Sequence, residues 1–176
     1  WSRGEELMTD RFPELARALD FLPSGTVIDG EIIAWQDEAP LPFNDLQKRI
    51  GRKTVPKKLL KDAPVILLAY DLLEEGGEDL REKPMSHRRA RLDALLTDLP
   101  PQAPLRASPR LNFETWDALH DARAMARDER AEGLMLKRLT SPYHLGRKKG
   151  DWWKWKLDPL TIDAVMIYAQ SGHGRR

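Results

Sequence analysis

The sequence predicts an α+β protein with mostly antiparallel sheets flanked by helices, and three observations support this class. Several segments rich in β-branched and aromatic residues indicate strands, among them residues 26–35 and 63–73. Apolar residues recur at helical spacing elsewhere, but helices and strands do not alternate regularly as in a βαβ protein. The 176 residues, 41% of them hydrophobic and 32% charged, have globular composition and suffice for one domain with a core.

The elements of the first half follow from apolar spacing and turn residues. A helix is predicted where five apolar residues recur at i, i+3, i+4 and i+7, namely Phe12, Leu15, Ala16, Leu19 and Leu22. Pro23 to Gly25 end this helix, and a strand over residues 26–35 follows. A short helix is expected over residues 43–50 with Asn44 as its N-cap. The continuous apolar run at residues 63–73 predicts a buried strand.

The second half begins with a turn over residues 74–79 and a helix over residues 86–99, which has leucines on one face. Prolines keep residues 102–111 extended, and Asn112 is the expected N-cap of a helix that runs to about Asp128. Three strands are then predicted, over residues 132–139, 151–157 and 161–170. A polar tail, residues 171–176, follows them.

The charge is unevenly distributed although the net charge is only +1. Residues 48–61 hold seven basic side chains and no acidic one, and residues 147–156 hold five against one aspartate. Such stretches suggest a polyanion such as nucleic acid, while a solvated lysine face is the alternative for the first stretch. The chain has no cysteine, no signal-peptide pattern and no apolar run of about 20 residues. We therefore expect a cytoplasmic protein without membrane contact.

Two short motifs combine a glutamate with a glycine. In "DGE", Asp29 and Glu31 share one strand face around Gly30, which suits a close approach of backbone or ligand. The alternative is a pair of solvent-facing acids. In "EGLMLK", regular alternation puts Glu132 and Lys137 on opposite faces, so a shared site for them requires a bulge or a strong twist.

A third motif, "DWWKWK", alternates tryptophan with lysine. Trp153 and Trp155 share the face expected to pack into a core, while Lys154 and Lys156 share the other face with Trp152. Two ammonium groups roughly 7 Å apart on one strand face need an anion between them, and a nucleotide phosphate fits. Tyr70, in "AYDLL" at the end of an apolar run, either stacks on a base or packs in the core.

Taken in order, "DGE", "YDLL", "EGLMLK" and "WWKWK" resemble the nucleotidyltransferase core of ATP-dependent DNA ligases, and the resemblance covers essentially the whole chain. The stretches "SRGEELMTDRFPEL", "FNDLQKRIGRK" and "TIDAVMIYAQSGHGRR" look closest to ligases of bacteria. This resemblance implies a location in the bacterial cytosol, in association with the nucleoid. The resemblance implies the ATP-grasp-like adenylation fold. Residues 1–170 are then expected to be part of an adenylation domain, and residues 171–176 the start of a linker toward an oligonucleotide-binding-fold domain.

The resemblance also implies roles for individual residues. Glu31 and Glu132 are expected to hold the ribose and a divalent metal, Mg²⁺ or Mn²⁺, and Tyr70 to stack on the adenine of ATP. Lys137, Lys154 and Lys156 are expected to contact phosphates, so the catalytic set in this chain is Lys154, Lys156 and Glu132. The expected DNA contacts are Arg3, at the nick 5′-phosphate, and the basic residues Lys48, Arg49, Arg52 and Lys53.

The family's nucleophilic lysine stands in K-x-D-G-x-R, and no such pattern exists here, because Val27 occupies the lysine position before Asp29-Gly30. We therefore expect the parent protein, a monomer acting on nicked double-stranded DNA, to be a ligase, and this chain alone to be inactive. Two alternatives remain open at this stage. One is an RNA ligase or an mRNA-capping nucleotidyltransferase, and the other is a nucleic-acid-binding module without catalysis.

Overall fold

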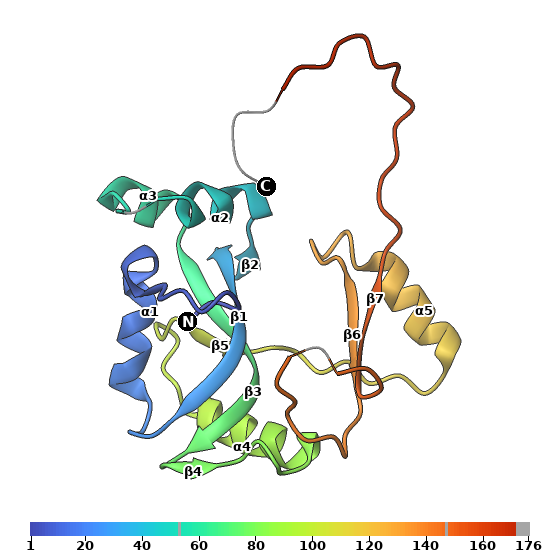
Figure 1. Cartoon of the computed structure of the whole chain (residues 1–176). Helices are drawn as coiled ribbons and strands as arrows, with labels where there is room; N and C mark the ends of the chain where they lie inside the picture. Colours follow the sequence, from blue (N-terminus) through green and yellow to red (C-terminus); the bar gives the residue numbers. More distant parts are fainter. Residues whose placement is uncertain (53, 147, 172–176) are drawn as a thin grey trace.

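The computed structural model describes residues 1–52, 54–146 and 148–171 and contains two sheets that face each other (Figure 1). The first sheet has the order β2-β1-β3-β4, with β5 paired to β3 in parallel and the other pairs antiparallel. The second sheet is the antiparallel pair β6-β7. The strands are β1 (Val27–Gln36), β2 (Ala39–Pro40), β3 (Val65–Glu75), β4 (Glu78–Asp79), β5 (Leu105–Ala107), β6 (Gly133–Lys137) and β7 (Trp152–Lys156). The α+β class with mostly antiparallel sheets is confirmed.

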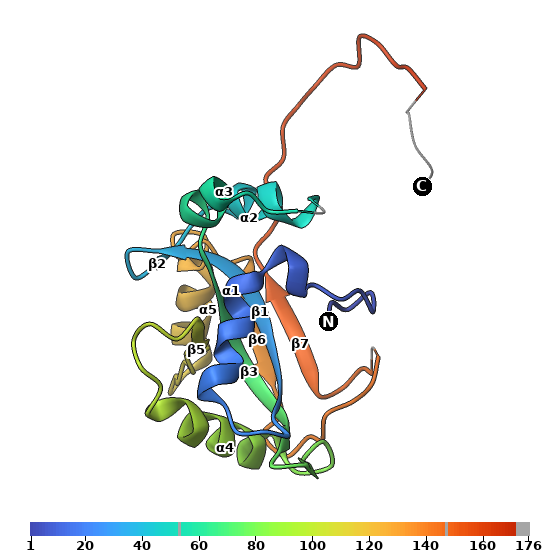
Figure 2. The ribbon, with the colours of Figure 1, turned by 90° about the vertical axis from the view of Figure 1, so that its left-hand side faces the viewer.

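Helices cover the outer faces of both sheets, so the layers run helix, sheet, sheet, helix (Figures 1 and 2). The first layer is η1 (Thr9–Arg11), α1 (Pro13–Ala16) and η2 (Arg17–Phe21), so the single helix expected from Phe12 to Leu22 is instead one short α-helix between two 3₁₀ turns. The other helices are α2 (Phe43–Ile50), α3 (Lys57–Asp62), α4 (Met85–Thr97) and α5 (Trp116–Met125). The spacing of apolar residues in the sequence does not predict α3.

Both predicted helix caps are wrong. The helix expected after Asn112 begins later, because Thr115 adopts an extended conformation and its hydroxyl accepts a hydrogen bond from the Ala118 N–H at 3.2 Å. Asn44 lies inside α2, whose N-cap position is Pro42 without a side-chain hydrogen bond. The N-cap preference therefore located each helix to within a few residues, but it identified neither capping residue.

The core lies between the first sheet and its helices. One cluster joins β3, α4 and β5 and consists of Ala69, Leu72, Leu80, Leu92 and Leu105. A second cluster joins the N-terminal turns to α2 and the strands, and it consists of Phe12, Ala34, Leu46 and Val65. The β1 and β3 members of both clusters, Ala34, Val65 and Ala69, share one face of the first sheet, and Asp29 and Glu31 of β1 lie on the opposite face.

The two sheets are held together by backbone contacts at the N-terminus of α4. The Met85 N–H donates to the Ser141 carbonyl at 2.8 Å and the Ser86 N–H to the Leu139 carbonyl at 2.9 Å. The Tyr143 N–H donates to the Arg81 carbonyl at 2.7 Å. These bonds fix the segment that follows β6 against the first half of the chain, and thereby fix where the β6-β7 sheet stands.

The strand predicted over residues 161–170 is not formed among the described residues. After β7, residues 157–171 have no regular structure, and Ile162, Val165, Met166 and Ile167 are at least 81% exposed. A β-strand needs a neighbouring strand for its backbone hydrogen bonds, and the described chain offers this segment none. The linker expected at residues 171–176 lies outside the described residues except for Ser171. None of the described helices is long and apolar enough to cross a membrane.

Candidate nucleotide site between the two sheets

A β-bulge in β3 aims Tyr70 at the second sheet. Asp29 of β1 pairs with Asp71, whereas the next residue, Gly30, pairs with Ala69, so Tyr70 is the extra residue of β3. Gly30 is required here because a Cβ at this position would lie 2.9 Å from the Leu68 carbonyl oxygen. The close approach expected at Gly30 is therefore to backbone rather than to a ligand.

Lys137 of β6 meets Tyr70 across the gap between the sheets. Its ammonium nitrogen lies 4.0 Å from the centroid of the Tyr70 ring and 3.9 Å from that of Trp152. The nitrogen is buried and makes no hydrogen bond to a described residue. Burial lowers the pKa of Lys137 to about 8, although the nearby carboxylates of Asp71 and Asp29 oppose this shift.

Tyr143, in the segment between β6 and β7, closes one side of the site. Its hydroxyl donates to Asp29 Oδ2 at 2.8 Å, and its ring meets Trp152 edge-on at 5.8 Å between centroids. Burial, reinforced by the Asp29 carboxylate, raises the pKa of both Tyr143 and Tyr70 well above the ordinary value. Arg3 stands close enough to both tyrosines to oppose that rise, which brings the N-terminal segment to this site.

Glu132 and Lys137 were expected on opposite faces of one strand, but Gly133 allows both to reach the same face. β6 begins only at Gly133, whose φ of +138° is open to glycine and strained for other residues, so Glu132 stands outside the regular alternation. Gly133 pairs with Lys156, and the Lys156 ammonium lies 2.6 Å from Glu132 Oε2. Because the Lys137–Trp152 pair and the Gly133–Lys156 pair share one face, Glu132 reaches the face that carries Lys137. Lys156, through its hydrogen bond and charge, lowers the pKa of Glu132.

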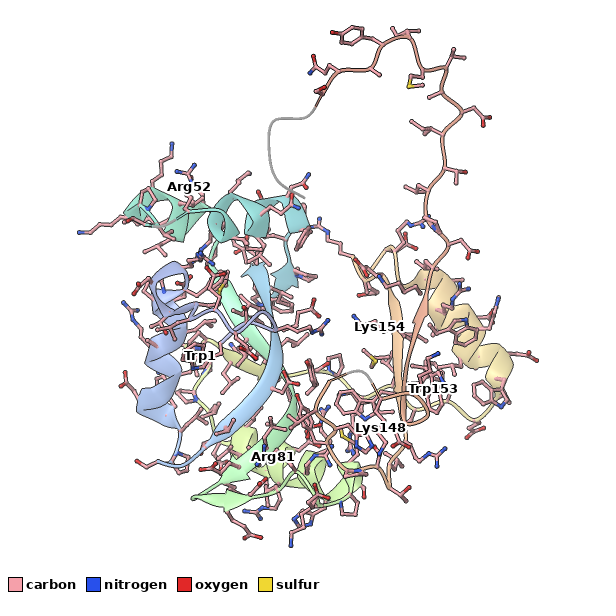
Figure 3. All side chains as sticks on the ribbon, viewed as in Figure 1. Trp1, Arg52, Arg81, Lys148, Trp153 and Lys154 are labelled. Atoms are coloured by element: carbon pink, nitrogen blue, oxygen red, sulfur yellow. The ribbon has the colours of Figure 1, made fainter. Side chains whose placement is uncertain are left out.

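Lys154 lies between Trp152 and Lys156 on this face and is exposed, and it makes no salt bridge to a described residue (Figure 3). The anion expected between the two lysines is thus partly supplied by the protein, since Glu132 already pairs with Lys156. Lys154 is the lysine of the pair whose charge remains available to a phosphate.

The opposite face of β7 packs less tightly than expected. Trp155 contacts α5, with its ring 6.0 Å from that of His120 and 5.2 Å from the Arg123 guanidinium carbon. Trp153 is 49% exposed, because the short helix α5 covers the Trp155 end of the strand only. The prediction that Trp153 anchors this strand in a core is therefore wrong, and Trp155 takes that role.

The other residues predicted for the nucleotide site and the DNA surface lie on β1, on α2 and just after α2. Glu31 is exposed on the face of β1 that also carries Asp29, as the alternation predicts. Lys48 is exposed and pairs with Asp45 at 2.5 Å, and Arg52 is exposed as well. Lys53 lies outside the described residues. Among the described residues, no group of three or more His, Asp and Glu side chains forms a ready metal site.

Arg49 is a correction to the predicted DNA surface. Its guanidinium is fully buried between α1 and α2, where it donates to both carboxylate oxygens of Glu14 and to the carbonyls of Arg11 and Ala63. It also lies 4.9 Å from the centroid of the Phe12 ring. An arginine with these partners ties two helices together and cannot reach a phosphate on the surface.

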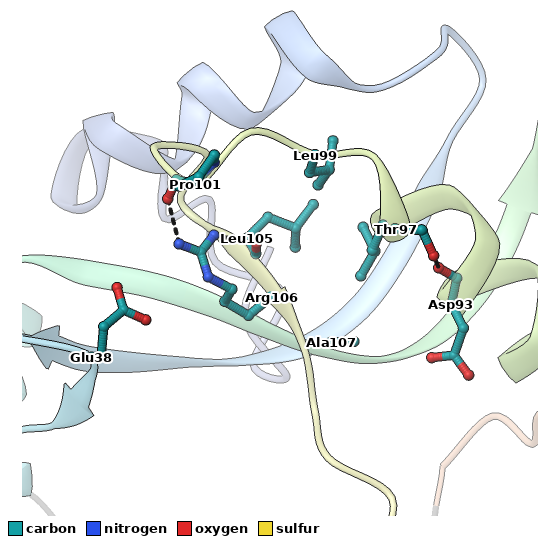
Figure 4. A pocket seen from close by; sticks show the side chains of 9 residues that line it. Glu38, Asp93, Thr97, Leu99, Pro101, Leu105, Arg106 and Ala107 are labelled. Carbon is teal, nitrogen blue, oxygen red and sulfur yellow. Dashed lines mark hydrogen bonds between the residues drawn. The ribbon is translucent and has the colours of Figure 1, made fainter.

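One surface pocket lies apart from this site. It has a volume of about 590 Å³ and is lined by the end of α4, by β5 and by the turn before β2, with Leu99, Leu105, Arg106 and Glu38 on its walls (Figure 4). None of the predicted site residues lines it. The candidate site is instead defined by the side chains of the two sheets that converge around Tyr70 and Lys137.

Four residues of this site were not assigned a role from the sequence: Asp29, Asp71, Tyr143 and Trp152. Asp71 accepts hydrogen bonds from Arg88 at 2.7 and 2.9 Å, and both side chains are fully buried. Arg88 also donates to the Ser141 carbonyl, so one guanidinium joins β3, α4 and the segment after β6. The sequence signals were the aspartates inside "DGE" and "YDLL" and the place of Trp152 on the lysine face of "DWWKWK", while Tyr143 gave no signal.

Comparison with known proteins agrees with this geometry. The family model described as "ATP dependent DNA ligase domain" matches residues 1–156. A probable DNA ligase of Koribacter versatilis is 32% identical and a DNA ligase of Haloferax volcanii is 36% identical, each over all of this chain and over 34% and 30% of its own length. The structure of mycobacterial DNA ligase D complexed with ATP and MES has a TM-score of 0.67 and 28% identity, covering 88% of this chain and 46% of that one.

The fold and the convergent site define a nucleotidyltransferase domain. More specifically, the chain belongs to the ATP-dependent DNA ligase domain family. It spans about a third of the length of the two relatives named above. The expectation of a bacterial type stays a prediction.

Proposed function

We propose that this chain is part of an ATP-dependent DNA ligase that seals nicks in double-stranded DNA through enzyme-AMP and DNA-adenylate intermediates. The observation that carries the proposal is the shared face of β6 and β7, where Lys154, Lys156 and Glu132 stand opposite the sheet that bears Tyr70. The bound ATP of the similar mycobacterial DNA ligase D supports ATP as the nucleotide.

The chemistry consists of three phosphoryl or nucleotidyl transfers. A lysine amine attacks the α-phosphorus of ATP, so a P–N bond forms as the bond to pyrophosphate breaks. The 5′-phosphate of the nick then takes the AMP and frees the lysine, and the 3′-hydroxyl attacks that 5′-phosphate and expels AMP. Such transfers depend on positioning and on neutralisation of charge, which lysines beside the phosphates provide. We assign this task to Lys154 and Lys156.

The attacking lysine has to come from outside the present set. No lysine of the 176 residues stands in a K-x-D-G-x-R setting. Lys154 and Lys156 are exposed, and lysines that neutralise phosphate charge are protonated and lack the free electron pair that attack requires. We therefore propose that self-adenylation requires residues beyond those of this chain.

Magnesium fits the donors that are present. Glu31 and Glu132 supply hard carboxylate oxygens, and both side chains are exposed at the site. Magnesium is usually held by one or two carboxylates together with substrate phosphates, which suits a site without a larger acidic cluster among the described residues. When bound, the ion would neutralise phosphate charge, while Glu132 would exchange its pairing with Lys156 for the metal.

The DNA-facing surface is proposed to include Arg3, Lys48 and Arg52. Arg3 stands near Tyr70 and Tyr143, at the proposed nucleotide site. Lys48 lies on α2. Arg52 follows this helix and points away from the first sheet (Figure 3). Replacing them should weaken binding to DNA of any sequence and reduce its dependence on salt.

The function is tested in the full-length protein with radiolabelled ATP, magnesium and denaturing electrophoresis. Wild type should give a labelled band, and the variant with both Lys154→Ala and Lys156→Ala should give none. The variant with both Lys57→Ala and Lys58→Ala, which removes two exposed lysines from α3, is the matched control and should label normally. A normal band from the Lys154/Lys156 variant would contradict the assignment of these lysines to the phosphates.

Parallel assays with different nucleotides and nicked substrates identify the class of reaction. ATP with nicked DNA should yield sealed product, whereas GTP or nicked RNA should not replace them. Better activity with GTP would identify a capping-type enzyme, and better activity with nicked RNA an RNA ligase. The isolated chain should give no labelled band, and a band from it would overturn the proposal that the nucleophile lies elsewhere.

A further inference from the structure

Lys137 is the one lysine of the site face that is sequestered rather than exposed. Its nitrogen is enclosed between two aromatic rings at 4.0 and 3.9 Å, one from each sheet, and has no described hydrogen-bond partner. Lys154 and Lys156, two and four residues along β7 from Trp152, are exposed instead. Lysines of one strand pair thus occupy two distinct environments, although the sequence suggested the same role for all three.

The enclosure separates Lys137 from any phosphate in the gap. A phosphate oxygen would need to reach a nitrogen whose approach is blocked by Tyr70 on one side and Trp152 on the other. Carbon atoms in contact lie roughly 3.5–4.0 Å apart, so the space between the rings holds the ammonium group and nothing further. Lys137 also covers one face of Tyr70, which leaves only the other face of that ring for a base.

We propose that Lys137 is a positioning residue for the adenine-stacking ring Tyr70 and is not a phosphate ligand. The inference rests on the proposed nucleotide site and specifies its division of labour. The Trp152 ring contacts one side of the ammonium group, and the ammonium group contacts one face of Tyr70. The opposite face of Tyr70 then stacks on the base. Lys154 and Lys156 serve the phosphates alone.

The charge of Lys137 gives this stack a chemical effect. The faces of aromatic rings carry negative electrostatic potential, so two ring faces repel each other unless one of them is depleted of electron density. A cation against one face of Tyr70 draws density toward itself, which makes the opposite face a better partner for an electron-rich purine. Removal of the charge should weaken base binding while phosphate binding is unaffected.

Calorimetry on the full-length protein with three probes separates the two roles: ATP, adenosine, which has no phosphate, and inorganic tripolyphosphate, which has no base. Lys137→Met keeps an unbranched side chain that is one atom shorter and removes its charge. It should lower adenosine affinity roughly three- to tenfold and leave tripolyphosphate affinity unchanged. Lys154→Met, the matched control, should do the reverse, and Lys137→Arg should restore adenosine binding because it keeps a cation between the rings. Circular dichroism and melting temperature establish that each variant is folded.

The acid–base behaviour gives a second readout that mere packing does not alter. Adenosine affinity of the wild type should fall as pH rises through the pKa of Lys137, and Lys137→Met should show no such step. The charged groups that act on Lys137 are Asp29, Asp71, Arg88 and Arg89, and Tyr70 itself stays protonated in this range. A loss of tripolyphosphate affinity in Lys137→Met, or unchanged adenosine affinity, would overturn the inference. Failure of wild type to bind ATP at all would instead contradict the proposed function.

Discussion

Asp71 and Arg88 form a fully buried ion pair with two parallel hydrogen bonds, at 2.7 and 2.9 Å, directly beside the bulge that aims Tyr70. A third bond from Arg88 reaches the Lys83 carbonyl at 2.5 Å and a fourth the Ser141 carbonyl at 3.1 Å. One charged pair therefore fixes β3 and α4 to the segment that carries Tyr143.

Asp71→Asn should destabilise the protein by about 3–5 kcal/mol, because it leaves the buried Arg88 charge without its counter-charge. Urea unfolding followed by circular dichroism measures the change. Asp79→Asn is the matched control, since Asp79 pairs with Arg81 on the surface through three side-chain hydrogen bonds, and its unfolding midpoint should barely move. Equal midpoints for the two variants would show that the buried pair has no special structural role.

Lys137 makes stability depend on pH at the alkaline end. Its pKa is about 8 in the folded protein and 10.5 as a model value for the unfolded chain, so between these values the unfolded chain binds more protons. The free energy of unfolding should therefore rise with pH from about 8 to about 10.5 by a contribution that Lys137→Met lacks. Urea titrations at several pH values, compared between the two proteins, measure the difference. Parallel pH profiles would show that burial does not depress this pKa.

The two tryptophans on the outer face of β7 should differ in their effect on stability. Trp155→Ala should cost about 2 kcal/mol or more, because its ring packs against His120 and Arg123 of α5. Trp153→Ala should cost less than about 1 kcal/mol, because half of this side chain is exposed. Thermal unfolding of both variants is the measurement, and the reverse order would return the anchoring role to Trp153.

Gly133 should tolerate no side chain. An added Cβ would lie 2.2 Å from the Trp155 carbonyl oxygen, and the positive φ adds backbone strain, so Gly133→Ala should cost about 3 kcal/mol. It should also disturb the Glu132–Lys156 pair and weaken ATP binding. Gly51→Ala provides the comparison, because Gly51 has open space and a negative φ, and it should change stability by less than about 0.5 kcal/mol. A folded Gly133→Ala protein of unchanged stability would contradict this account of the start of β6.

Local patterns predicted the strands and the faces of their side chains well. The β-branched and aromatic runs located β1, β3, β6 and β7, and alternation placed Lys154 and Lys156 together. Strand positions and side-chain faces depend on residue type and on the two-residue alternation of a strand, so the sequence of a single strand is enough to predict them. The bulge at Tyr70 was not predictable in this way, because a bulge is a relation between two strands about 40 residues apart.

Charge was the least reliable guide, because the partner of a charge is usually distant in sequence. Arg49 lies in a basic stretch but binds Glu14, 35 residues earlier, and Arg88 binds Asp71, 17 residues earlier. The apolar segment at residues 161–170 has the composition of a strand but lacks a described pairing edge. In each case the residue type shows that an ion pair or a strand can form, but whether it forms depends on a partner elsewhere in the fold.

The hydrogen bond between Tyr143 and Asp29 joins residues 114 positions apart, and the bond from Arg130 to the Pro40 carbonyl joins residues 90 positions apart. Contacts of such long sequence separation require large loops to close, which slows their formation during folding. The strands within each sheet can pair before these bonds form. We therefore expect the contacts between the two sheets to form among the last events of folding. Nucleotide affinity would then be acquired only by fully folded molecules, and ATP would shift the folding equilibrium toward them by mass action.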